Sequence, residues 1–313
     1  MRMVIFMKYD IIKKSYLASF DIDDKIIKDL IIINTKCLVD NNMQRFVFID
    51  ENRLRDELVY HRFYGQKPSY NNILNILLPI ILANTNIQKS EDEVVKLIQK
   101  YIKYLKKEEK LFDYIIGAVM YNSIIHNLLE NKDIKYAELL QKVKEKIIGF
   151  SIELNKLNTI KFQMARINAI QNIDNYIDLK FQEYDDEKIV LSILNILYDI
   201  YIEDRDTINS GIEGMKKSIL SILGEDVNSN IDNIDFILSM AQYIIKLRDY
   251  KINKTLYNNN SDPRKLISLN EGDNIMDPIL NQITVISKSF NNNILNLKIK
   301  SKSGNYTFKF KKA

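Results

Sequence analysis

Glycine, proline, cysteine and histidine are all scarce in this sequence, and each shortage excludes certain structures. There are 8 glycines and 4 prolines in 313 residues, which leaves few positions for the tight turns of a many-stranded β-sandwich. The single cysteine, Cys37, excludes an intramolecular disulfide and a cysteine-based zinc site, and it fits a reducing compartment. The two histidines, His61 and His126, are too few for a three-histidine metal site.

Long hydrophobic runs are also missing. The longest, Ile76 to Ala83, has eight residues, well short of the roughly 20 that a membrane-spanning helix needs. The N-terminal stretch MRMVIFMKYD has too short an apolar run for a signal peptide, and no small-residue cleavage site follows it. We therefore predict a cytoplasmic protein that has no membrane partner.

Apolar residues at helical spacing fill most of the chain. The stretch from Glu108 to Asn131 is apolar around most of its circumference, which predicts a central helix buried by neighbours on several sides. Gly117 and Ala118 leave room there for a closely packed partner helix. A short strand is expected at 45–49. Further helices are expected at 52–64, 69–85 with a kink or split at Pro79, from a capping box at Ser90–Glu93 onward, and at 134–158, 159–177, 185–203, 208–223 and 231–257.

The pattern changes after Tyr257. A polar linker at 258–263 is followed by apolar residues that alternate with polar ones, which is typical of strands. The alternation runs through Ile283 to Val285, Leu295 to Ile299 and Tyr306 to Phe310, with turn residues at 291–293 and 303–305. We predict a mainly α protein. It comprises a helical domain at 1–257, an irregular multi-helix bundle whose first 50 residues are possibly mixed α/β, and a small antiparallel β module at 264–313.

The opening of this β module resembles small SH3-like or Tudor-like barrels and the C-terminal modules of UvrD-type DNA helicases. The resemblance rests on Gly272-Asp273, on the Asp277-Pro278 step and on Thr284-Val285. Asn281 and Gln282 stand where such modules usually carry glycines. The resemblance implies a barrel-like module that binds proteins or nucleic acids without doing chemistry.

The charge of the chain is uneven. Residues 251–313 contain eleven Lys or Arg against four Asp or Glu, which is +7, and the whole chain has +4, so the remainder carries −3. Within the predicted strands, lysines alternate with the apolar residues and should share one outward face that can contact phosphates, although lysines on edge strands also serve to prevent aggregation. The candidate binding residues are Lys298, Lys300, Lys302, Lys309 and Lys311.

One segment suggests an enzyme instead. Arg55 and His61 stand six residues apart, a spacing that resembles the Arg-x4–6-His signature of HEPN ribonucleases, which are all-helical. The resemblance implies that His61 would act in proton transfer on an RNA 2′-hydroxyl and that Arg55 would hold the phosphate. The alternative is a histidine that is solvated or faces a partner on a charged helix. His126, on the central helix, is expected to be a core or rim residue.

Other catalytic patterns are missing from the sequence. Asp199 and Glu203 are four residues apart and could hold Mg²⁺ from one helix face, but the spaced aspartates of isoprenoid synthases do not accompany them. No glycine-rich phosphate loop, nucleophile elbow or zinc spacing occurs, so we predict neither a metal nor another cofactor. The hypothesis is a non-enzymatic interaction protein that docks on nucleic acid or a protein partner through its β module. The alternatives are the HEPN-like ribonuclease and a structural or assembly protein.

Overall fold

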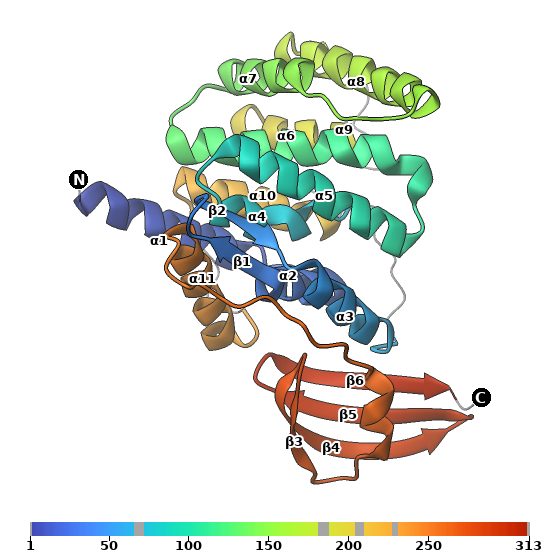
Figure 1. Ribbon diagram of the computed structural model, residues 1–313. Helices are drawn as coiled ribbons and strands as arrows, with labels where there is room; N and C mark the ends of the chain where they lie inside the picture. Colours follow the sequence, from blue (N-terminus) through green and yellow to red (C-terminus); the bar gives the residue numbers. More distant parts are fainter. Residues whose placement is uncertain (1, 66–71, 181–187, 204–209, 227–230, 312–313) are drawn as a thin grey trace.

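The computed structural model describes residues 2–65, 72–180, 188–203, 210–226 and 231–311. In Figure 1 the helices form a layered body, with α7 and α8 at one end and the C-terminal sheet beyond the opposite end. The described helices are α1 (Arg2–Ala18), α2 (Lys25–Cys37), α3 (Glu51–Arg62), α4 (Leu78–Ala83), α5 (Ile87–Leu105), α6 (Leu111–Glu130), α7 (Tyr136–Gly149), α8 (Lys156–Ile177), α9 (Ile189–Tyr201), α10 (Ser210–Leu223) and α11 (Ile234–Arg248), with short 3₁₀ turns at η1 (Leu74–Leu77), η2 (Glu108–Lys110) and η3 (Pro263–Ser268). The strands are β1 (Leu38–Asn41), β2 (Phe46–Ile49), β3 (Asn274–Asp277), β4 (Asn281–Asn291), β5 (Ile294–Ser301) and β6 (Gly304–Lys311).

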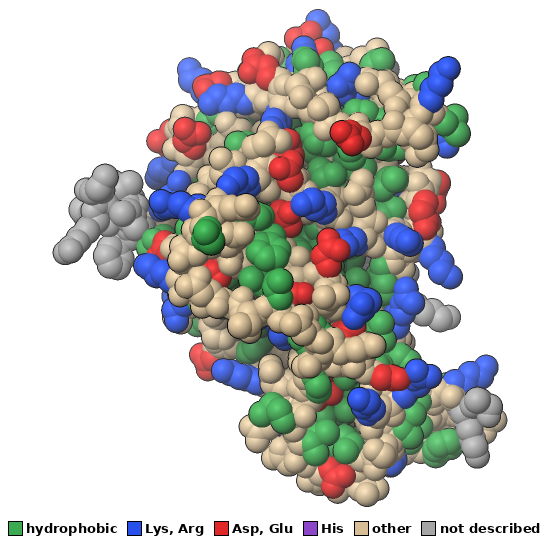
Figure 2. Space-filling view, viewed as in Figure 1, with side chains coloured by type: hydrophobic (Ala, Val, Ile, Leu, Met, Phe, Trp, Pro, Cys, Tyr) green, Lys and Arg blue, Asp and Glu red, His purple; other side chains and the backbone are tan. Residues whose placement is uncertain are grey.

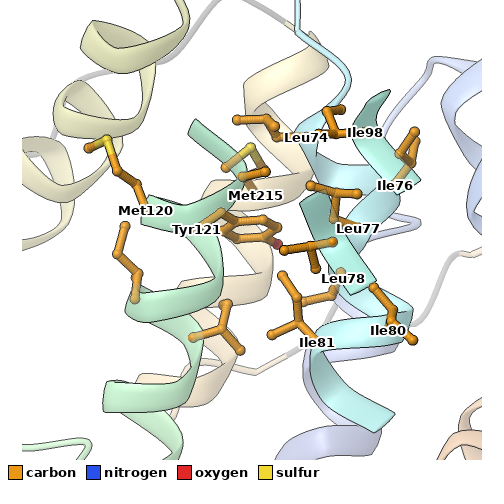
Figure 3. Packing of buried hydrophobic residues seen from close by; sticks show 14 of the residues in the cluster. Leu74, Ile76, Leu77, Leu78, Ile80, Ile81, Ile98, Met120, Tyr121 and Met215 are labelled. Atoms are coloured by element: carbon orange, nitrogen blue, oxygen red, sulfur yellow. The ribbon is translucent and has the colours of Figure 1, made fainter. Parts of the chain in front are cut away.

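The helix α6 lies at the centre of the body, as the sequence predicts. Its residues from Tyr114 to Ile125 are all buried, and Figure 3 shows Tyr121 between the α4 segment and Met215 of α10. A Cβ atom at Gly117 would lie 2.7 Å from Ile189 and 2.9 Å from Leu74. The glycine therefore permits the close approach of neighbouring elements that the sequence suggested.

Several expected elements are confirmed with adjusted ends. The strand at 45–49 is β2, which pairs antiparallel with β1, and the helix at 52–64 is α3, capped by Asp50. The helix expected at 69–85 is the 3₁₀ turn η1 followed by α4, with Pro79 in the first turn of α4, where proline is tolerated. Its expected cap, Ser69, and residues 185–187 and 208–209 of two later helices lie outside the described residues.

Three predictions about helix ends are wrong, because local contacts override the sequence pattern. Helix α5 begins at Ile87 with Asn86 as its cap, and Ser90 lies inside the helix, where its hydroxyl donates to Asn122. The single helix expected at 134–158 ends at Gly149, and α8 begins only at Lys156, capped by the side chain of Asn155. The helix expected at 231–257 ends at Arg248, and the chain continues in an extended form.

The C-terminal module is a four-stranded antiparallel sheet in the order β3-β4-β5-β6. The mainly α fold with a small β module is thus confirmed. The sheet is a meander, and no pairing joins its edge strands β3 and β6 within the described residues. Asn281 has a φ of 62° in the left-handed region, where asparagine substitutes for glycine more readily than most residues.

The inner face of this sheet packs on the helical body. Val285, Leu297 and Phe308 form a second hydrophobic core together with Tyr60 of α3 and with Tyr64, which follows the end of that helix. The rings of Tyr64 and Phe308 meet edge to face, with centroids 5.1 Å apart. The C-terminal half of α3 therefore covers the sheet, and the two parts of the chain share one hydrophobic cluster.

An extended segment, residues 251–262, joins α11 to the module along the surface of the body (Figure 1). Three buried carboxylates from the first part of the chain bind its backbone. The bonds run from the N–H groups of Ile252 and Asn253 to Asp40, of Tyr257 to Asp50, and of Ser261 to Asp56. These bonds explain why the segment is extended, since a helix would use the same N–H groups internally.

Candidate nucleic-acid interface

The five candidate lysines of the module are all exposed. Strand register places Lys298 opposite Thr307, and Lys300 opposite Asn305 and Thr284. Since cross-strand partners project to the same face, these residues share the outward face, whereas Leu297 and Phe308 face the core. In Figure 2 Lys and Arg side chains gather on the module near the C-terminus.

The composition of this outward face is its most informative property. Besides lysines, its paired positions are occupied by Ser, Thr, Asn and Gln, with Met276 and Ile294 as the apolar exceptions. No carboxylate and no aromatic ring occupies a paired outward position in the described strands. The candidate lysines form no ion pair with any described residue. Their charge is therefore available to an anionic partner.

Lys309 and Lys302 differ from the other three. The aliphatic chain of Lys309 lies against Gly65, so that a Cβ atom there would be only 2.3 Å from Lys309 Cδ, and its backbone N–H donates to Phe63 O at 2.7 Å. Lys302 lies in the β5–β6 turn and lines a cavity at the junction with the helical body. Lys298, Lys300 and Lys311 are thus the lysines that belong to the outward face alone.

The structure places Arg55 and His61 in different surroundings on α3. The Arg55 side chain is 57% exposed and pairs with Asp56 at 3.1 Å, beside an open groove that Arg264 also lines. His61 is 4% exposed, and its Nδ1 lies 3.0 Å from the hydroxyl of Tyr104. No described hydrogen bond or ring contact joins the arginine to the histidine.

Burial determines the protonation of both histidines. It lowers the pKa of His61 from 6.5 to about 4, and burial together with nearby Arg248, Lys8 and Lys146 lowers the pKa of His126 to about 3. Neither Nε2 atom has a hydrogen-bond partner among the described residues, and Figure 2 shows no histidine on the face it presents. Both imidazoles are therefore neutral at pH 7; His61 is buried, and His126 is half-buried.

The acidic residues Asp199 and Glu203 do not share a helix face, although the sequence suggested that they would. Helix α9 ends at Tyr201, before Glu203, and the buried Asp199 lies 3.7 Å from Lys216. Over the described part of the chain, no group of three or more His, Cys, Asp or Glu side chains has a metal-binding arrangement.

The structure also contains a cavity that the sequence does not indicate. It has a volume of about 210 Å³ and lies between α2, α3, α11 and two turns of the β module. Four of its lining residues are basic: Lys36, Arg53, Lys254 and Lys302. These four residues are distant in sequence, and none of them lies in a recognisable binding motif, so no local pattern could have revealed the grouping.

Comparison with known proteins gives no family for this chain: no family, curated protein or solved structure matches it. Among the helices that the structure describes, none is both long enough and apolar enough to cross a membrane. Any functional assignment therefore depends on the geometry of the chain itself.

Proposed function

We propose that this protein binds nucleic acid through the outward face of its C-terminal sheet, without catalysing a reaction. The observation that carries the proposal is the composition of that face, which has exposed lysines without ion pairs, small polar side chains and no carboxylate. Lysines in such a setting neutralise phosphates and release their counterions. Hydroxyl and amide side chains add uncharged hydrogen bonds to phosphate and sugar.

The face favours the double-stranded backbone over single strands. Binding of single strands draws much of its energy from stacking of bases on aromatic side chains, and the paired outward positions of the described strands carry none. Recognition is then through phosphates, and it is insensitive to sequence. We include a cytoplasmic location in the proposal, on the evidence of the single buried cysteine.

The other two functions receive less support from the geometry. A HEPN-like ribonuclease would require His61 to reach an RNA hydroxyl, and the imidazole is enclosed beside Tyr104 and Tyr64. A purely structural role for the module gives no reason for the lack of carboxylates on its outward face. It is the outcome to be accepted if nucleic acid does not bind.

The test uses the full chain, because removing the module would expose the aromatic residues of α3 that pack on it. Duplex binding is measured from 50 to 200 mM salt for the wild type and for K298Q/K300Q/K311Q. Each lost phosphate contact should flatten the slope of log affinity against log salt by about 0.9, so the triple variant should lose about 3 in slope.

A matched control removes three exposed lysines at the far end of the body, in K132Q/K156Q/K161Q. It changes the net charge equally and should leave the slope nearly unchanged. Equal losses in the two triple variants would show that binding follows net charge rather than this face. No binding of duplex by the wild type at low salt would refute the proposal and leave protein docking as the function of the module.

A further inference from the structure

The cavity at the junction of the body and the module is lined by four basic residues and by no carboxylate. Lys36 Nζ lies 2.6 Å from Glu57, and Arg53 Nη2 lies 3.5 Å from the same carboxylate. Glu57 thus forms ion pairs with two cations. Lys254 Nζ donates to the backbone oxygen of Lys36 at 2.9 Å, and neither Lys254 nor Lys302 forms an ion pair with a described residue.

Two features show that Arg53 and Lys254 are incompletely compensated by the surrounding protein. The Nε of Arg53 is buried and has no hydrogen-bond partner in the described structure, and an unmade hydrogen bond of a buried charged group is costly. Burial and the neighbouring Arg53 lower the pKa of Lys254 to about 8, against the opposing effects of Asp50 and Glu57. A bound anion would compensate both residues.

The remaining walls are apolar. Phe236, Met240 and Tyr243 of α11 line one side, and the ammonium of Lys254 lies 5.7 Å from the centre of the Tyr243 ring. Ligand pockets usually combine such apolar walls with a few convergent polar groups, and they have volumes of about 300 to 1,000 Å³. A cavity of about 210 Å³ suits a small ligand and is too small for a dinucleotide cofactor.

We propose that this cavity binds a phosphate group, with Arg53 and Lys254 as its principal contacts and Lys302 closing the site from the β module. The phosphate belongs to a small phosphorylated molecule or to the end of a nucleic-acid strand, and the chemistry of the contact is the same. The site is separate from the outward face of the sheet, since Lys298, Lys300 and Lys311 do not line it. Because its walls come from both parts of the chain, an occupied site holds the module against the body.

Thermal unfolding of the full chain with pyrophosphate, compared with sodium chloride at matched ionic strength, tests the proposal. The wild type should be stabilised in a saturable manner, as expected for a ligand that binds only the folded state. Lys254→Met should weaken the pyrophosphate effect at least about tenfold, because a hydrogen bond to a charged group is lost. The same variant should unfold at a higher temperature than the wild type when no ligand is present, since a half-buried charge that its surroundings disfavour has been removed.

Lys254→Met should thus raise the unfolding temperature and weaken pyrophosphate binding. If Lys254 had only a structural role, its loss would instead destabilise the fold. Lys246→Met, on the exposed side of α11, is the matched control and should keep the pyrophosphate effect. So should K298Q/K300Q/K311Q, and this result would hold even if the sheet did not bind duplex. A wild type whose unfolding temperature does not change in pyrophosphate, or a Lys254→Met variant with an unchanged response, would overturn the proposal.

A competition experiment distinguishes the two sources of phosphate. A short 5′-phosphorylated duplex that displaces pyrophosphate, while the unphosphorylated duplex does not, would assign the site to strand ends. Independent binding of pyrophosphate and both duplexes would assign it to a small molecule. Either result supports the phosphate site itself.

Discussion

The lowered pKa values of the buried His61 and the half-buried His126 lead to a measurable prediction about acid stability. In the folded state the pKa of His61 is about 4 and that of His126 about 3, whereas both titrate near 6.5 in the unfolded chain. Below pH 6.5 the unfolded state therefore binds more protons than the folded state. The free energy of unfolding must fall as the pH drops from 6.5 toward 4.

The size of the effect follows from the same values. A pH of 5 is about 1.5 units below the pKa of a histidine in the unfolded chain, and each unit stabilises the protonated unfolded state by about 1.4 kcal/mol. His61 alone then lowers the stability by about 2 kcal/mol at pH 5, and both histidines together by about 4 kcal/mol. This is a large part of the roughly 5 to 15 kcal/mol that stabilises a typical domain.

Urea unfolding at pH 7, 6 and 5, followed by circular dichroism, measures the effect in the wild type, His61→Gln and His126→Gln. Protonation of carboxylates also destabilises the fold in acid, but it is common to all three proteins and cancels in the comparison. Each variant should lose about 2 kcal/mol less than the wild type between pH 7 and pH 5. If the loss in His61→Gln equals that in the wild type, the imidazole is protonated in the folded state and the description of its surroundings is wrong.

Two further predictions concern packing and the joint between the two parts of the chain. Gly117→Val should destabilise the fold by about 1 to 3 kcal/mol through overpacking, because its side chain would overlap Ile189 and Leu74; urea unfolding measures this, and an unchanged midpoint would contradict the close approach. Asp56→Ala leaves the buried N–H of Ser261 without its acceptor and should cost about 1 to 3 kcal/mol; hydrogen exchange should show faster exchange at that amide, and unchanged protection there would contradict the bond.

Where a sequence pattern reflects burial along a single element, it was sufficient to predict the structure. The alternation from Ile283 to Phe310 predicts three strands, because one face of the sheet lies on a core and the other faces solvent. The apolar stretch around Gly117 likewise predicts a buried central helix. Both features depend on short-range periodicity, which a single sequence displays directly.

Features that depend on distant contacts could not be predicted in this way. Ser90 has the sequence context of a helix cap, yet it is used to bind Asn122, thirty-two residues away. The extended segment after Arg248 looks helical by composition, and only the carboxylates of Asp40 and Asp50 show why it is not. The four basic residues of the cavity come from four separate segments, so no spacing within the sequence could have indicated it.

The three aspartates that hold the extended segment have a consequence for synthesis of the chain. Asp40, Asp50 and Asp56 leave the ribosome early, whereas the N–H groups that they bind follow about 200 residues later, as do the strands that cover Tyr60 and Tyr64. Until then these side chains remain in water on an unfinished protein. A chain that stops short displays an aromatic patch beside uncompensated carboxylates, which is the type of surface that chaperones and proteases recognise. Burial of this patch therefore depends on synthesis of the strands β4 to β6, whose residues form one hydrophobic cluster with Tyr60 and Tyr64.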